Sequence, residues 1–231
     1  MGLFTSTGVG KESDKAAQIL KSFVSKGKIP TEAIANAKGL AIFSAIRAGM
    51  YLAGSGGSGI VVARLADGTW SPPSAFSVRS GSIGLVYGVD VYDCVCVLNT
   101  DAAVEAYSKP EMNLGGTVAA AAGPIGGTAD MNMKEYKPVW VYTKSRGLYG
   151  GLTVDGTVIK EKGDANAEFY GSKVTAAQIL RGDVRAQVGG SKWPAGAKQL
   201  VEVLKLAEGK RADEGVLQGI STEPTPGDLE E

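Results

Sequence analysis

Between residues 39 and 161 the sequence alternates short β-prone runs with glycines and turn residues, and this alternation limits the possible folds most. Examples of the runs are GLAIFSAIRAG, SGIVVARLADGTW, VYDCVCVLN and GLTVDGTVIKE. Asp67-Gly68 and Asp155-Gly156 each lie between β-prone segments, which predicts β-hairpins. Sequential hairpins favour an antiparallel sheet, and the 33 glycines are expected to permit bulges and tight bends in it.

Helical patterns flank the β-prone region. Residues 11–25 predict an amphipathic helix, because apolar and polar side chains separate onto different faces at 100° per residue. Further helices are expected over residues 30–38, 101–109, 175–182 and 196–207. These elements indicate an α+β fold class: a curved, barrel-like antiparallel β core with an N-terminal amphipathic helix and flanking helices.

The chain divides into three expected parts. Residues 1–10 are predicted to be a flexible N-terminus. Residues 11–208 form one domain, which is long enough to bury a substantial core. Residues 209–231 contain few large apolar side chains and are predicted to be a disordered acidic tail. From residue 212 onward this tail holds no Lys or Arg, and its carboxylates are Asp213, Glu214, Glu223, Asp228, Glu230 and Glu231.

The composition argues against several classes of function. The chain has no histidine, which excludes imidazole metal sites and Ser-His or Cys-His catalysis. The 24 basic and 24 acidic side chains balance, so no nucleic-acid partner is expected. Cys94 and Cys96 are interpreted as buried thiols in a reducing, cytoplasmic compartment. No apolar run reaches the ~18 residues of a membrane span. No cofactor or metal site is expected.

Two motifs resemble functional sites but are not expected to bind a cofactor or to catalyse a reaction. GSGGSG at residues 54–59 matches the dinucleotide-binding fingerprint in its letters, but a β-prone run follows it where that fingerprint needs a helix. It is therefore predicted to be a flexible inter-strand loop. Asp90 and Asp93 lie three residues apart in a β-prone run, so they should face opposite ways and make a poor acid-base pair.

The first 28 residues favour contact with an anionic membrane. They contain five lysines against Glu12 and Asp14, a local balance of +3. A basic amphipathic helix of this kind is typical of proteins that bind anionic lipid surfaces. In addition, MGLFTS satisfies the acylation pattern M-G-x-x-x-[ST], which makes Gly2 a candidate for N-myristoylation. One acyl chain alone binds marginally, and the neighbouring lysines would supply the second signal that stable anchoring needs.

An ordered series of sequence blocks resembles the SYLF domain. The blocks are IPTEAIANAKGLAIFSAIRAG, GSGIVVARLADGTWSPPSA, AAGPIGG, SRGLYGG and NAEFYG followed by VTAAQILRG. The likeness runs from about Lys11 to about Leu206. SYLF domains occur in fungal endocytic proteins, in animal relatives with an SH3 domain and in plant relatives with a FYVE finger. No SH3 pattern follows the domain in this chain, so no SH3-mediated partner is expected.

The resemblance implies a non-enzymatic module that binds phosphoinositide-containing membranes through its N-terminal helix. For the fungal members it also implies binding to actin filaments. The implied location is cytoplasmic, peripheral at the plasma membrane or at endocytic cortical actin patches. The K-A-A-x-I-L pattern of the family begins here at Lys15, so the implied lipid contacts fall on the helix around it. The candidate lipid-binding residues are Lys11, Lys15, Lys21, Lys26 and Phe23.

Two other functions stay open at the level of sequence. One is a hydrolase or transferase that uses carboxylate or tyrosine chemistry inside the β core, which a carboxylate with a strongly shifted pKa in a deep pocket would favour. The other is a soluble carrier of an apolar ligand, which a large closed cavity would favour.

Overall fold

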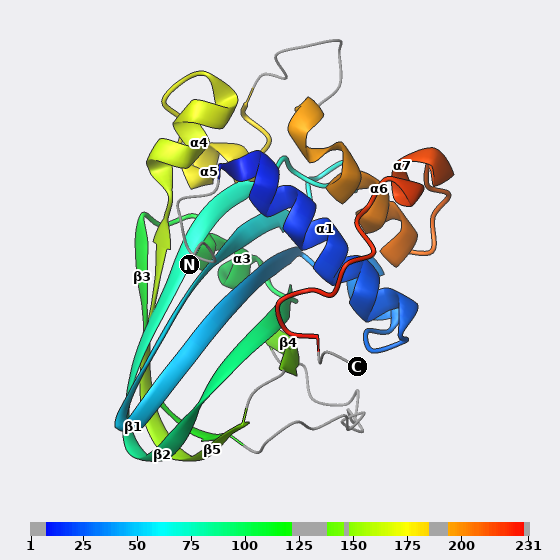
Figure 1. The fold of residues 1–231 in the computed structure, drawn as a ribbon. Helices are drawn as coiled ribbons and strands as arrows, with labels where there is room; N and C mark the ends of the chain where they lie inside the picture. The colour runs from blue at the N-terminus through cyan, green and yellow to red at the C-terminus, as the bar shows by residue number, and fades with distance from the viewer. Residues whose placement is uncertain (1–7, 122–137, 146–147, 185–193, 229–231) are drawn as a thin grey trace.

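The structure, a computed structural model, describes residues 8–121, 138–145, 148–184 and 194–228. An antiparallel sheet of long, bent strands carries helices at one end (Figure 1). The expected α+β class with an N-terminal helix is confirmed. In chain order the elements are α1 (Val9–Ser25), α2 (Thr31–Ala35), β1 (Gly39–Ala63), β2 (Ser74–Leu98), α3 (Asp101–Tyr107), β3 (Glu111–Ala121), β4 (Val139–Ser145), β5 (Leu148–Glu161), α4 (Gly163–Tyr170), α5 (Ala176–Leu180), η1 (Ala195–Ala197), α6 (Lys198–Ala207) and α7 (Glu214–Gln218).

The strands β1 and β2 form the body of the sheet. They are 25 residues long each and pair antiparallel along almost their whole length. The other edge of β2 pairs with β5 over residues 76–89 and with β4 over residues 92–98. β3 adds to β5, which gives the order β1-β2-β5-β3 with β4 beside β2. The predicted turn at Asp67-Gly68 is confirmed, since Gly68 has φ 78° and its N–H donates to the Leu65 carbonyl.

Two sequence predictions about glycine-rich segments are wrong. GSGGSG lies inside β1, where a Cβ on Gly57 would lie 2.2 Å from the Ser44 carbonyl oxygen. A Cβ on Gly59 would lie 2.1 Å from the carbonyl oxygen of Ile42, so these glycines allow two parts of β1 to touch through their backbones. Asp155-Gly156 is also no hairpin turn. It lies within β5, whose backbone pairs with β2 on one side and β3 on the other.

The main core lies between the helices and one face of the sheet. The apolar side of α1 packs against strand residues such as Ile42, Ile60 and Val97, and against α6. At about 1.5–3 kcal/mol for each large apolar side chain removed from water, this face holds α1 firmly on the sheet. The opposite face of the sheet forms a second core with α3, where Cys94 and Cys96 lie buried as free thiols, as predicted.

The C-terminal segment differs from the disordered tail that the sequence predicts. Asp213 caps α7 by accepting a hydrogen bond from the Val216 N–H, and the side chain of Ile220 is 2 % exposed within the main core. The chain then crosses α1 and approaches β4 (Figure 1). The reason is polar: buried carboxylates on other elements accept backbone N–H groups of this segment, including that of Gly227. Such anchoring leaves little trace in hydrophobic composition.

The N-terminal boundary of the folded domain also differs slightly from the predicted one. α1 begins at Val9, whose side chain is fully buried, so residues 9 and 10 belong to the folded domain and not to a flexible N-terminus. Gly2 and the rest of the acylation pattern lie outside the described residues.

Candidate functional site

The helix α1 presents one buried and one outward face. Its buried face carries Ala16, Ala17, Ile19, Leu20 and Phe23. The helix ends in a glycine motif: Gly27 adopts φ 62°, its N–H donates to the Val24 carbonyl, and the Lys28 N–H donates to the Phe23 carbonyl. The four candidate lysines lie on the outward face, where Lys11 and Lys26 are exposed and Lys15 and Lys21 are half-buried.

Phe23 does not lie with these lysines. Its side chain is 1 % exposed and packs in the main core, so it has no surface to offer a lipid in this conformation. The expectation that Phe23 contacts lipid is corrected accordingly. The physical reason is that the apolar face of the helix packs against the sheet and α6 and is therefore buried.

Three of the four lysines have partners within the protein. Lys15 Nζ lies 2.7 Å from the buried carboxylate of Glu12 and 3.3 Å from the Ser58 carbonyl oxygen. Lys21 Nζ donates to the Leu217 carbonyl oxygen at the end of α7, at 2.8 Å. Lys26 Nζ forms an ion pair with Asp228 at 3.3 Å, although its side chain is 56 % exposed. Intramolecular contacts therefore occupy much of this basic face.

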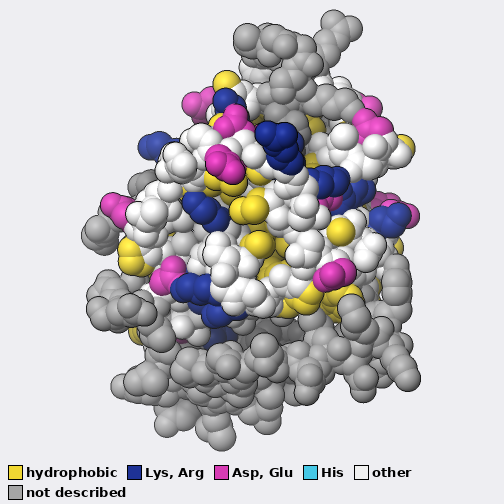
Figure 2. Space-filling model, turned by 90° about the vertical axis from the view of Figure 1, so that its right-hand side faces the viewer, with side chains coloured by type: hydrophobic (Ala, Val, Ile, Leu, Met, Phe, Trp, Pro, Cys, Tyr) yellow, Lys and Arg dark blue, Asp and Glu magenta, His cyan; other side chains and the backbone are white. Residues whose placement is uncertain are grey.

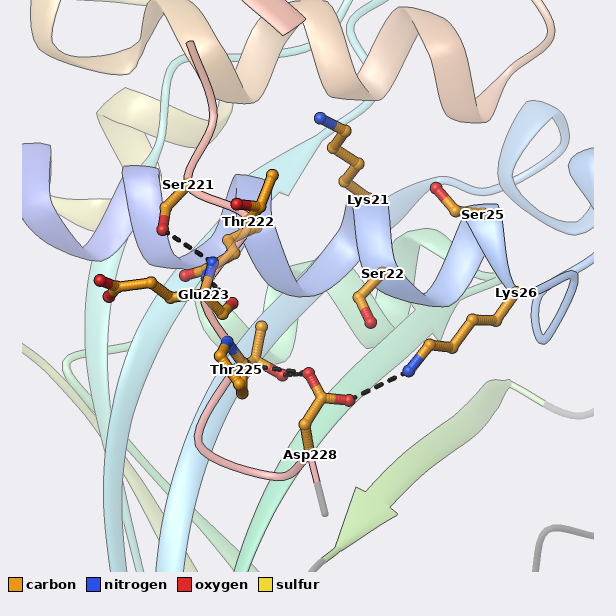
Figure 3. A pocket seen from close by; sticks show the side chains of 11 residues that line it. Lys21, Ser22, Ser25, Lys26, Ser221, Thr222, Glu223, Thr225 and Asp228 are labelled. Carbon is orange, nitrogen blue, oxygen red and sulfur yellow. Dashed lines mark hydrogen bonds and ion pairs between the residues drawn. The ribbon is translucent and has the colours of Figure 1, made fainter. Parts of the chain in front are cut away.

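Residues 221–228, here called the strap, cross the outward face of α1 (Figure 3). A hollow of about 680 Å³ lies between strap and helix (Figure 3). Its wall contains two lysines, two carboxylates and several hydroxyl groups. The lining residues are Gln18, Lys21, Ser22, Ser25, Lys26, Ser221, Thr222, Glu223, Pro224, Thr225 and Asp228.

Lys144 of β4 is the charged centre beneath the strap. Its side chain is buried, and Nζ lies 2.8 Å from Asp228 Oδ1 and 3.6 Å from Asp93 Oδ2. Nζ also donates to the hydroxyl groups of Ser22, at 3.0 Å, and of Thr225, at 2.6 Å. One ammonium group thus connects α1, the sheet and the strap.

The two carboxylates around Lys144 are held differently. Asp93 is fully buried and accepts hydrogen bonds from the Ser44 hydroxyl at 2.6 Å and the Gly227 N–H at 3.0 Å. Asp228 accepts from the N–H and hydroxyl of Thr225. Burial alone would raise the pKa of Asp228, but the hydrogen bonds from Lys144 and Thr225 outweigh it and hold that pKa well below its ordinary value. The strap carboxylate is therefore ionised at neutral pH.

Gly227 fits the strap against the sheet. A Cβ at this position would lie 2.4 Å from the Lys144 carbonyl oxygen and 2.6 Å from the Asp93 N atom. Both are backbone atoms, which cannot move aside as a flexible side chain could. The strap is thus held by shape as well as by charge.

Sequence reasoning missed Lys144, Asp228 and Gly227, which complete this site. The sequence pattern compares Asp93 only with Asp90, and the structure gives the two carboxylates separate cations: Asp90 pairs with Arg47 at 2.7 Å. A charged residue inside the apolar run VYDCVCVL was the available signal that Asp93 needs a buried partner. The partner itself, 51 positions later (144 − 93), could not be found that way.

The charges on this side of the molecule are mixed. On the face where α6 and α7 lie, Figure 2 shows Lys and Arg side chains interleaved with Asp and Glu around apolar areas. Within the described ranges, no group of three or more Cys, Asp or Glu side chains is arranged to hold a metal ion. Nor is any helix in those ranges both long and apolar enough to cross a bilayer.

Comparison with known proteins decides the family. Residues 79–207 match the family model Ysc84, described as "Las17-binding protein actin regulator". The chain is a member of the Ysc84 family. This confirms the likeness to the SYLF domain. The matched range extends from β2 through α6, so α1 and the strap lie on either side of it.

Several curated proteins resemble this Ysc84-family chain. LAS seventeen-binding protein 3 of Saccharomyces cerevisiae is 41 % identical over 186 residues, covering 75 % of this chain and 40 % of the relative. Human SH3 domain-containing YSC84-like protein 1 is 40 % identical over 214 residues, covering 88 % of this chain and 60 % of the relative. Protein YSC84 of Saccharomyces cerevisiae is 38 % identical over 206 residues, or 84 % of this chain and 42 % of the relative. The Ysc84-family chain thus spans about 40–60 % of the length of these relatives. No solved structure matches it significantly.

Proposed function

We propose that this protein is a peripheral membrane module that binds phosphoinositides and other anionic phospholipids through the outward face of α1, and that links such membranes to actin filaments. The observation that carries the lipid part is the array of four lysines on one face of a helix whose other face is packed on the core. The actin part is supported by the descriptions of the family and its relatives, which name actin regulation and Las17 binding. The module would then act at the cytoplasmic side of the plasma membrane or at endocytic cortical actin.

The way in which α1 binds lipid follows from the burial of its apolar side chains. Because Phe23 and its apolar neighbours are in the core, the described part of α1 contacts lipid through charge and not through insertion. Lysines near an anionic leaflet contribute about 1 kcal/mol each, and their attraction falls off within a Debye length. That length shrinks from ~10 Å at 0.1 M salt to ~3 Å at 1 M, so binding should weaken steeply as salt is added.

Removal of three of the lysines tests the lipid site. Lys11, Lys21 and Lys26 are replaced together by glutamine, while Lys15 is retained because it neutralises the buried carboxylate of Glu12. At about 1 kcal/mol per lysine, vesicle affinity should fall roughly a hundredfold. Binding is measured by co-sedimentation with phosphatidylcholine vesicles that contain phosphatidylinositol bisphosphate.

A matched control removes the same charge elsewhere. Lys109, Lys160 and Lys173 are exposed and lie outside α1. Their triple glutamine variant should bind within a few-fold of the wild type. Equal loss in both variants would attribute binding to net charge and remove α1 as the site. Co-sedimentation with actin filaments, with and without vesicles, tests the second half of the proposal.

The alternatives have less support. The described hollow is lined by charged and hydroxyl-bearing side chains, whereas a carrier of an apolar ligand needs an apolar cavity. The pKa of Asp228 in that hollow is lowered by Lys144 and Thr225, which is the opposite of what a general acid requires. We therefore propose a non-enzymatic role.

A further inference from the structure

We propose that the strap, residues 221–228, is an internal competitor for the lipid site, and that Lys26 and Lys144 form an anion site which a phosphorylated headgroup takes when the strap leaves. This inference rests on the proposed function of α1. It adds a residue outside the helix, Lys144, and a closed state in which the strap holds the site.

The strap carboxylate occupies the place that an anionic ligand would take. Asp228 Oδ1 lies 3.3 Å from Lys26 Nζ and 2.8 Å from Lys144 Nζ (Figure 3 shows the contact with Lys26). Lysine ammonium groups bind carboxylates and phosphates by the same charge-assisted hydrogen bonds. The adjoining hollow also contains Lys21 and the hydroxyl groups of Ser22 and Ser25, which suit the oxygens of a phosphate monoester.

The charges around the site favour a ligand of higher charge than a carboxylate. Once the strap leaves, Lys144 keeps its ion pair with the buried carboxylate of Asp93, and Lys26 and Lys144 together with Asp93 carry a net charge of +1. With Lys21 on the rim the balance becomes +2. A phosphate monoester carries about −1.5 to −2 at neutral pH, against −1 for Asp228. A headgroup that bears such phosphates can therefore displace the strap.

The strap is anchored by polar contacts of Thr225, Gly227 and Asp228 rather than by buried apolar side chains. Residues 221–224 are exposed, and Gln18 Nε2 donates to the backbone carbonyl of Glu223. Only Thr225 and Gly227 of the strap are buried. Few buried apolar contacts and several solvent-exposed polar ones are typical of segments that open locally. Because strap and membrane use the same lysines, each weakens the binding of the other by the same factor.

Two variants release the strap by different means. Gly227→Ala places a Cβ against the backbone of Lys144 and Asp93 and leaves every charge in place. Asp228→Asn removes the ion pairs with Lys26 and Lys144 and adds no bulk. Gly219→Ala is the matched control in the same C-terminal segment, because its Cβ would meet ordinary contact distances of 3.4 Å and beyond.

Release is first verified without lipid. Hydrogen exchange at the Gly227 amide reports release of the strap, since this amide donates to Asp93 of the sheet in the closed state. Vesicle affinity is then measured for the wild type, the three variants, and Gly227→Ala combined with the glutamine substitutions at Lys11, Lys21 and Lys26.

Release should raise affinity for phosphatidylinositol bisphosphate vesicles on the order of tenfold, because two lysines become available at the surface. The control Gly219→Ala should match the wild type, and the combined variant should lose the gain. Exchange at Gly227 in the wild type should accelerate when these vesicles are added. Acceleration by inorganic phosphate alone, at an equal concentration of phosphate groups, would assign the site to a free phosphate and overturn a membrane ligand.

The remaining outcomes separate the two proposals. If both release variants free the strap yet bind vesicles as the wild type does, while the lysine variant loses binding, α1 remains the lipid site and the strap is no competitor. If neither the wild type nor the release variants bind vesicles, the lipid function and the competition both fail.

Discussion

Replacement of Lys144 by methionine should destabilise the protein by about 3–5 kcal/mol. Methionine has a similar length and volume, so the change removes the charge and leaves little cavity. The fully buried carboxylate of Asp93 then loses the cation 3.6 Å away. At an effective dielectric constant of about 20, that contact is worth roughly 4–5 kcal/mol. Breaking one side of a buried ion pair typically costs about 3–5 kcal/mol.

The lower part of this range is the better expectation. Asp93 keeps the hydrogen bonds from the Ser44 hydroxyl and the Gly227 N–H, which continue to stabilise its negative charge. For a chain of this size, about 3 kcal/mol corresponds to a fall of roughly 6–12 °C in melting temperature. Urea unfolding, with the slope m compared between variants, gives the free energy directly.

A second substitution shows whether the orphaned charge is the cause. Asp93→Asn retains an acceptor for the Ser44 hydroxyl but removes the buried negative charge. The double variant Lys144→Met with Asp93→Asn should therefore be more stable than Lys144→Met alone. A loss below about 1 kcal/mol for Lys144→Met, or a double variant that merely adds the two single losses, would refute the proposed pairing.

Three further predictions concern other parts of the chain. Gly59→Ala should destabilise by about 3 kcal/mol or more in urea unfolding, because its Cβ meets the Ile42 carbonyl oxygen at 2.1 Å, whereas Gly163→Ala, with nothing within 4 Å, should be nearly neutral. Because the pKa of Asp228 is lowered in the folded protein, its contribution to the stability of the strap is complete above about pH 4 and is lost as the pH falls further. Protection of the strap amides, corrected for intrinsic exchange, should therefore stay constant between about pH 5 and 8. A loss of protection near pH 6 would contradict this prediction. Finally, if Gly2 is acylated, intact-mass spectrometry of protein from its native cell should show loss of Met1 and addition of a C14 acyl group, and an unmodified or acetylated mass would exclude the anchor.

Local periodicity and turn chemistry predicted much of the fold. The 3.6-residue pattern of α1 and the turn at Asp67-Gly68 depend on neighbouring residues, so one sequence is enough to find them. The same holds for α5, where Thr175 and Gln178 form a capping box. The lysines of α1 could be assigned to its outward face for the same reason.

Local sequence patterns gave wrong predictions where contacts with distant parts of the chain determine the structure. Asp155-Gly156 has the letters of a hairpin turn, but ladders with β2 and β3 on both sides hold it extended. The glycines of GSGGSG predict a flexible loop, whereas in the structure Gly57 and Gly59 allow close approach of backbone to backbone. Phe23 fits a lipid-facing stripe and a core-facing stripe equally well, and only the position of the sheet decides between them.

Residue types and spacings alone are enough to predict the amphipathic basic helix and the glycine-rich antiparallel sheet of this chain, and to exclude histidine chemistry. Those properties follow from residue types and spacings along the chain. The meeting of Asp93, Lys144 and the strap residue Asp228 is visible only in the folded chain. Their partnership joins residues 51 and 84 positions apart, by the differences 144 − 93 and 228 − 144. A buried charge needs a partner for electrostatic reasons, but which residue supplies it depends on how the whole chain folds.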